Sequence, residues 1–112
     1  MAKYLFQASY TATGAKGIAA EGGSSRREQV AKMMQDMGRH LDSFYFAFGS
    51  TDVFGIADIP DNITAAAISL AINSSGAVST KIVVLITPEE MDEAAKNLSP
   101  IVHLVANNIK TD

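Results

Sequence analysis

The stretch LDSFYFAFGSTDVFGIADI, residues 41–59, contains two alternating apolar segments on either side of a short polar turn. In the first segment, Leu41–Phe48, the phenylalanines fall on every second position, as one face of a β-strand requires. Gly49–Asp52 has the composition of a turn, and Val53–Ile59 alternates again. The stretch therefore predicts a β-hairpin of two antiparallel strands.

On the N-terminal side of this hairpin, the sequence predicts one strand and one helix. Lys3–Thr11 alternates and is rich in aromatic residues, which indicates a strand, and the glycine-rich residues after it predict a loose connection with room for one helical turn. Ser25 and Glu28 have the spacing of a capping box that starts a helix, and Gly38 is a suitable stop. Its apolar face has the helical spacing i, i+3, i+4 and i+7: Val30, Met33, Met34 and Met37.

On the C-terminal side, the sequence predicts a helix, a strand and a last helix. Asp61 is a suitable cap for a helix of about Asn62–Ser75, and Ala77–Thr87 alternates as a strand. Thr87, with a proline and two glutamates after it, predicts the start of the last helix. Ile101–Ala106 fits a short helix or a tail strand equally well. The predicted buried stripe of the last helix is Met91, Ala94, Ala95 and Leu98.

This order of elements predicts an α+β fold, a ferredoxin-like βαββαβ plait with a C-terminal helix. In that fold, four antiparallel strands carry two helices on one face. No linker or low-complexity run interrupts the chain, and its length suits one core. We predict a single domain over residues 1–112.

The composition excludes several classes of function. The chain has 47% hydrophobic residues, no cysteine and a formal net charge of −3. Disulfide scaffolds, thiolate nucleophiles and iron–sulfur clusters all need cysteine. A sequence pI near 5.2 disfavours nucleic-acid binding, which requires a basic surface. We expect neither a cofactor nor a nucleic-acid partner.

The apolar stretches of the chain are short. Gln7 and Ser9 interrupt the N-terminal one, so it is not typical of a secretory signal. Ala65–Ile72 and Ile82–Ile86 fall well below the roughly 20 residues of a membrane span. We expect a soluble, cytoplasmic protein with no membrane partner.

The second face of the predicted sheet is unexpectedly apolar. Two helices cover only one face, yet each predicted strand has apolar residues on both. An uncovered apolar face of that size is unusual for a monomer. We therefore expect a homo-oligomer, most simply a symmetric homodimer that pairs sheet against sheet. The alternative is that Ile101–Ala106 folds back over this face.

Three stretches of the sequence resemble the GYD domain family: Glu21–Arg27, Phe44–Gly49 with Asp52, and Leu85–Glu90. The resemblance covers Lys3–Lys96. It implies a small bacterial protein with a ferredoxin-like fold of the dimeric α/β-barrel type, and it brings no established activity. In the turn, Thr51 stands where the family usually has a tyrosine, so no role of that tyrosine is transferred to this chain.

The start of the first predicted helix is a candidate ligand-binding site. Two glycines precede Ser24, Ser25, Arg26 and Arg27, so free N–H groups, two hydroxyls and two guanidinium groups could bind a phosphate or a carboxylate. The spacing matches neither a Walker loop nor a dinucleotide fingerprint. A capped helix with two solvated arginines is the simpler interpretation.

His40 is the candidate acid or base. It follows the predicted helix stop, and its possible partners are Asp42, Asp52 and Tyr45. A solvated loop histidine is the simpler interpretation. His103 suits a packed or interfacial segment, and two distant histidines do not predict a metal site.

Two further features have competing interpretations. Asp58, inside the third predicted strand, is either an outward-facing residue of an edge strand, which we favour, or a buried functional carboxylate. The tyrosines and phenylalanines either line a ligand pocket or form core and interface.

These observations favour an oligomeric module that binds a small organic or anionic ligand at the sheet face or at Ser24–Arg27. The alternative is a cofactor-independent enzyme of the dimeric α/β-barrel type, in which His40 acts with Asp52 or Tyr45. We rank the module first because no nucleophile, base and orienting residue form a recognisable set. An RNA-binding domain is the weakest of the three.

Overall fold

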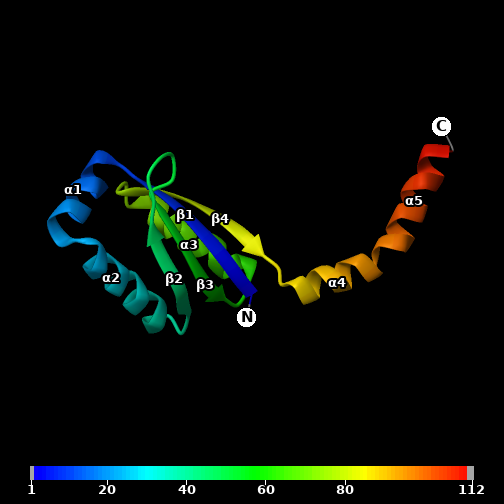
Figure 1. Ribbon diagram of the computed structural model, residues 1–112, viewed down its shortest axis with the longest axis horizontal. Coiled ribbons are helices and arrows are strands. Elements are labelled where there is room, and N and C mark those ends of the chain that lie inside the picture. The colour runs from blue at the N-terminus through cyan, green and yellow to red at the C-terminus, as the bar shows by residue number, and fades with distance from the viewer. Residues whose placement is uncertain (1, 111–112) are drawn as a thin grey trace.

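The computed structural model describes residues 2–110 of the chain, with side chains as far as residue 107. A four-stranded antiparallel sheet lies at its centre (Figure 1). The strand order is β2-β3-β1-β4, which is the ferredoxin-like arrangement that the sequence predicts. The strands are β1 (Ala2–Tyr10), β2 (His40–Phe46), β3 (Val53–Ile59) and β4 (Val78–Leu85).

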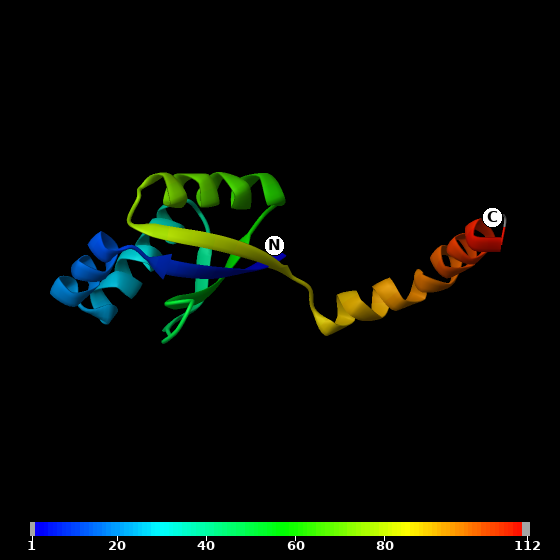
Figure 2. The same ribbon diagram turned by 90° about the horizontal axis from the view of Figure 1, so that it is seen from above.

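Two helices cover one face of this sheet, which we call the helix face (Figure 2). α2 (Gly23–Asp36) packs mainly over the outer strand β2, and α3 (Asn62–Ser74) packs mainly over the other outer strand, β4. The strands supply every second side chain to the core, as their period of two dictates. The buried core consists of Tyr4, Phe6, Met34, Ala57, Ile59, Ala65 and Ile68.

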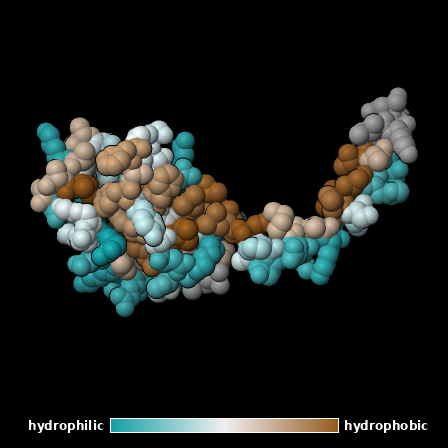
Figure 3. All heavy atoms as spheres, viewed as in Figure 1, coloured by the Kyte–Doolittle hydropathy of each residue, from teal (hydrophilic) through white to brown (hydrophobic). Residues whose placement is uncertain are grey.

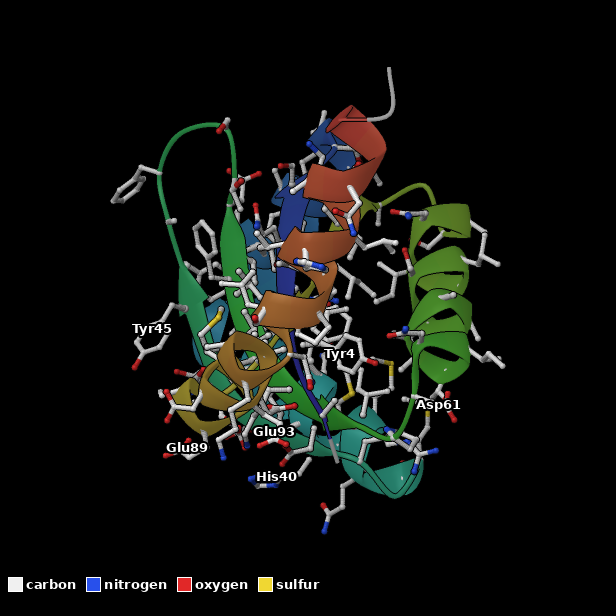
Figure 4. All side chains as sticks on the ribbon, turned by 90° about the vertical axis from the view of Figure 1, so that its right-hand side faces the viewer. Tyr4, His40, Tyr45, Asp61, Glu89 and Glu93 are labelled. Atoms are coloured by element: carbon white, nitrogen blue, oxygen red, sulfur yellow. The ribbon has the colours of Figure 1, made fainter. Side chains whose placement is uncertain are left out.

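The opposite face of the sheet, which we call the open face, has no helix over it (Figure 2). Its central residues are neighbours in the strand register, where Leu5 of β1 lies between Ile56 and Val83. Beside them, Phe54 pairs with Tyr45 on β2. Tyr45 is 69% exposed and points away from α3, whereas Tyr4 points towards it (Figure 4).

The connection after β1 differs from the sequence prediction. It forms a full helix, α1 (Ala12–Glu21), rather than a loose segment. Thr11 starts α1 because its hydroxyl accepts a hydrogen bond from the Gly14 N–H at 3.2 Å. A Cβ at Gly14 would lie 2.2 Å from the carbonyl oxygen of Ala77, so the absence of a side chain there lets α1 approach the loop before β4. Gly14 therefore reflects the close packing of a helix and not a loose loop.

α2 also begins earlier than predicted. Gly22, with a φ of 88°, is the N-cap, and no side chain caps the helix. The capping box proposed at Ser25 and Glu28 is wrong, because both residues already lie within the helix. Gly23 fits this start because a Cβ there would lie 2.9 Å from the Phe46 ring.

The hairpin is shorter than predicted. β2 ends at Phe46, and the Ala47 N–H donates to the Asp52 carbonyl at 2.8 Å to close the loop. A register shift between Leu41 and Ser43 keeps Phe44 and Phe46 on the helix face. Phe48, predicted on the same strand face, is instead fully exposed in the loop.

The start of α3 agrees with the sequence. Asp61 is the N-cap, and its carboxylate accepts a hydrogen bond from the Thr64 N–H at 2.7 Å. On β3, however, Asp58 does not lie on an edge strand, because β3 pairs with both β1 and β2. The interpretation of Asp58 as an outward-facing residue of an edge strand is therefore wrong.

The chain ends in an arm of two helices, α4 (Pro88–Lys96) and α5 (Leu98–Lys110), which extends away from the sheet (Figure 1). The predicted capping box at Thr87 and Glu90 is present in full. Ile101–Ala106 belongs to α5, so it is helical, and it does not fold back over the open face. The predicted buried stripe is wrong within this chain, since Met91, Ala94, Ala95 and Leu98 are all exposed.

The arm is nevertheless amphipathic. Its apolar side chains gather on one side, the inner side of the bend between body and arm (Figure 3). Because the arm extends away from the sheet, the molecule measures 62 × 30 × 23 Å.

Among the described residues, no helix has the length and apolar character needed to cross a membrane.

Candidate functional site

A cavity of about 450 Å³ lies between the helix face of the sheet and the helices α2 and α3. It forms because α2 covers one outer strand and α3 the other, which leaves a space between the two helices. Its walls are mostly apolar. They include Phe6, Met33, Met34, Phe44, Val53 and Ile72.

Three polar side chains line the end of this cavity nearest α1: Tyr10, Arg26 and Gln29. The Nη2 of Arg26 lies 3.3 Å from Oε2 of Glu21, and the Gln29 Nε2 donates to the same oxygen at 3.3 Å. The Nε of Arg26 is buried, and no hydrogen-bond acceptor for it occurs in the described part of the chain. Gly17 on α1 lies beside the guanidinium, since a Cβ there would be in ordinary van der Waals contact with Nη2 at 3.8 Å.

Tyr10 is a hydrogen-bond donor at this end of the cavity. Burial raises the pKa of its hydroxyl, and the nearby Arg26 charge opposes that rise in part. The phenol therefore stays neutral at physiological pH and keeps its proton. Together with Arg26, it supplies hydrogen-bond donors at this end of the cavity.

The predicted ligand-binding residues form the first turns of α2 rather than a loop. Of these four residues, Arg26 alone lines the cavity. Ser24 and Arg27 are exposed, and Ser25 is half-buried. One of the predicted residues therefore lines a cavity that only the packing of α2 and α3 creates.

The predicted catalytic residues do not meet. His40 and Tyr45 lie five positions apart along β2, which corresponds to roughly 15 Å along a strand. Asp52 instead accepts a hydrogen bond from the Tyr10 backbone N–H at 2.8 Å. His40 is 72% exposed, and its Nε2 lies 3.4 Å from Oδ1 of Asp42 (Figure 4).

A cluster of charges at one end of the open face was not predicted. Lys3 Nζ contacts the Asp42 carboxylate and lies 2.8 Å from Oδ1 of Asp58. Hydrogen bonds to Asp42 and then to Asp58 raise the pKa of Lys3. The three residues come from three strands, so only the strand register brings them together. His103 is separate from this cluster and exposed on α5.

The described residues contain no group of three or more histidine, aspartate or glutamate side chains arranged to hold a metal ion. A comparison with protein families gives a match to the GYD domain over residues 4–95. The chain belongs to the GYD domain family. The GYD match contains the whole cavity, whereas α5 lies beyond it. A comparison with curated proteins and one with solved structures both give no match.

Proposed function

We propose that this GYD domain is a self-associating module that binds a small organic molecule between its sheet and its helices. The observation that carries the proposal is the cavity of about 450 Å³. Binding sites for small molecules commonly have volumes of about 300–1,000 Å³, mostly apolar walls and a few polar groups. Protein interiors are otherwise packed as densely as organic crystals, so a space of this size favours a ligand over a packing defect.

The cavity opens to solvent between the two helices, since its lining residues Gln29 and Met33 on α2 and Ala71 on α3 are exposed. Ala71 lines the cavity and is exposed, so its methyl group lies at this opening. Ala67 lies one turn earlier on α3 and does not line the cavity. These two alanines provide a matched pair for testing whether the cavity binds ligands.

The test uses N-phenyl-1-naphthylamine, a neutral dye whose fluorescence rises in apolar sites. We expect saturable binding of one dye per chain, loss of that binding in Ala71→Trp and unchanged binding in Ala67→Trp. A tryptophan at Ala71 blocks the opening without altering the buried side of α3. Absence of saturable binding, or equal binding by both variants, would refute the ligand-binding proposal.

Exposed apolar side chains support the self-association part of the proposal. On the open face, Phe54 and Val83 are 36% and 40% exposed, and on the arm, Leu98 and Val102 are 56% and 53% exposed. Exposed apolar side chains grouped on these two surfaces are unusual for a monomer. A second copy of the chain offers complementary surfaces of the same kind.

A further inference from the structure

The polar end of the cavity offers two hydrogen-bond donors, the Arg26 guanidinium and the Tyr10 hydroxyl, whereas the Gln29 Nε2 already donates to Glu21. Arg26 carries a permanent charge, Tyr10 keeps its phenolic proton, and Gln29 has an amide group. The hydroxyl of Ser75, a polar lining residue near α3, already donates to the Ile72 carbonyl at 2.7 Å. A ligand that pairs with Arg26 and Tyr10 must therefore bring hydrogen-bond acceptors.

Arg26 is incompletely paired within the described structure. Glu21 contacts its Nη2 at 3.3 Å, which is long for a charge-assisted bond, and the buried Nε has no partner. A buried donor without an acceptor costs free energy that a bound acceptor would recover. The Nε–H and the neighbouring Nη2–H form a planar fork that matches the two oxygens of a carboxylate.

The charge balance of the lining favours a monoanion. Arg26 is the one charged residue among the lining side chains of this cavity, and the Glu21 carboxylate at 3.3 Å from its Nη2 already offsets part of its charge. A dianion such as a phosphate monoester would bring one charge too many into a mostly apolar space. A carboxylate matches both the fork and the single charge.

We infer that the ligand of this cavity is an amphiphilic organic acid, with an apolar ring or chain between α2 and α3 and a carboxylate on Arg26. This inference rests on the proposed function and specifies its ligand class. Tyr10 donates a further hydrogen bond to the carboxylate. Glu21 competes with the ligand for Nη2 and so limits its affinity.

The experiment compares two probes of nearly equal shape, 1-naphthylacetate and its neutral amide, 1-naphthylacetamide. Their dissociation constants are measured by titration calorimetry against the full chain. We expect the acid to bind about tenfold more tightly than the amide, the ratio expected for one charge-assisted pair. Equal affinities for the two probes would overturn the inference.

Variants of the arginines locate the carboxylate. Arg26→Gln should weaken binding of the acid about tenfold or more and leave the amide nearly unchanged. Arg27→Gln removes the same charge from the next position, which is exposed and outside the cavity lining, and should leave the acid unaffected. Equal losses in the two variants would indicate nonspecific attraction and overturn the inference.

A third variant tests the competition. Glu21→Gln should strengthen binding of the acid several-fold, because the ligand no longer displaces a carboxylate from Nη2. Weaker acid binding in this variant would show that Glu21 positions Arg26, and would refute the inference that Glu21 competes with the ligand for Nη2.

The two levels of the proposal fail differently. In the first case, the neutral dye binds and Ala71→Trp abolishes its binding, but Arg26→Gln leaves the affinity for the acid unchanged. The cavity is then a binding site for another class of ligand. If neither the dye nor the acid binds, the proposed function fails together with the inference.

Discussion

The carboxylate of Asp52 accepts a hydrogen bond from the backbone N–H of Tyr10, with 2.8 Å between Oδ2 and the amide nitrogen. The Asp52 N–H in turn donates to the Ala8 carbonyl at 2.8 Å. One residue therefore joins the β2–β3 loop to the end of β1, where the chain turns towards α1. This aspartate also lies in the stretch that gives the GYD resemblance. Its two hydrogen bonds to β1 give it a structural role there.

Replacing Asp52 by alanine should lower the free energy of unfolding by about 1–2 kcal/mol, because the Tyr10 N–H loses a charged acceptor. Thermal denaturation followed by circular dichroism measures the loss. Asp52→Asn retains an acceptor oxygen and should lose clearly less. If both variants unfold at the wild-type temperature, the hydrogen bond does not stabilise the fold.

Gly14→Ala should destabilise the protein by about 2 kcal/mol or more, since its Cβ would clash with a backbone oxygen rather than with a movable side chain. Gly17→Ala is the control in the same helix. Its Cβ meets one atom at 3.8 Å, and alanine stabilises a helix interior by roughly 1 kcal/mol relative to glycine. Chemical denaturation of both variants should give shifts of opposite sign. A stable Gly14→Ala protein would contradict the close packing of α1 at Ala77.

Charges on the open face should separate the copies of the chain. We expect the wild type to be an oligomer by light scattering after gel filtration, and Phe54→Glu with Val83→Glu to be a monomer with an unchanged circular dichroism spectrum. The control is Ile63→Glu with Leu70→Glu, since these residues are 82% and 73% exposed on α3. A monomeric wild type would contradict self-association, and dissociation in the α3 variant alone would assign the interface to α3.

The cap of α3 should make stability depend on pH in the acid range. The hydrogen bond from the Thr64 backbone N–H holds the pKa of Asp61 below its usual value of 3.8. Because the folded pKa is the lower one, the stabilisation is fully present above the unfolded pKa and is lost as pH falls through the folded pKa. Melting temperatures between pH 5 and pH 2.5 should fall less steeply for Asp61→Asn, which keeps the cap without the charge. Parallel curves for the two proteins would contradict this role.

The fold was largely predictable because its signals are local. Period-two alternation marked all four strands, and Asp61 and Thr87 marked two helix starts through their own hydrogen bonds. The α1 helix was missed because its glycines are typical of a loop, whereas Gly14 is required by close packing against Ala77, far along the chain. Asp58 was misplaced because its interpretation rested on its own strand alone, although the predicted plait already places the third strand between the first and the second.

The candidate site was predictable only in part. Arg26 was a candidate because it lies near a helix start. It lines a cavity only because α2 covers one outer strand of the sheet and α3 covers the other. The cluster of Lys3 with Asp42 and Asp58 depends on the register of three strands. No spacing along the chain encodes either arrangement.

The sequence by itself determined the strands, two capped helices, the ferredoxin-like order and the excess of apolar residues. These follow from the alternation of side chains and from hydrogen bonds between residues three positions apart, which are properties of short segments. The sequence also placed part of that excess on the open face, whereas only the tertiary structure decided where the rest lies: around a cavity under the helices and along an arm that extends away from the sheet. Packing decides this because burial depends on which surfaces meet, and that is a property of the whole chain.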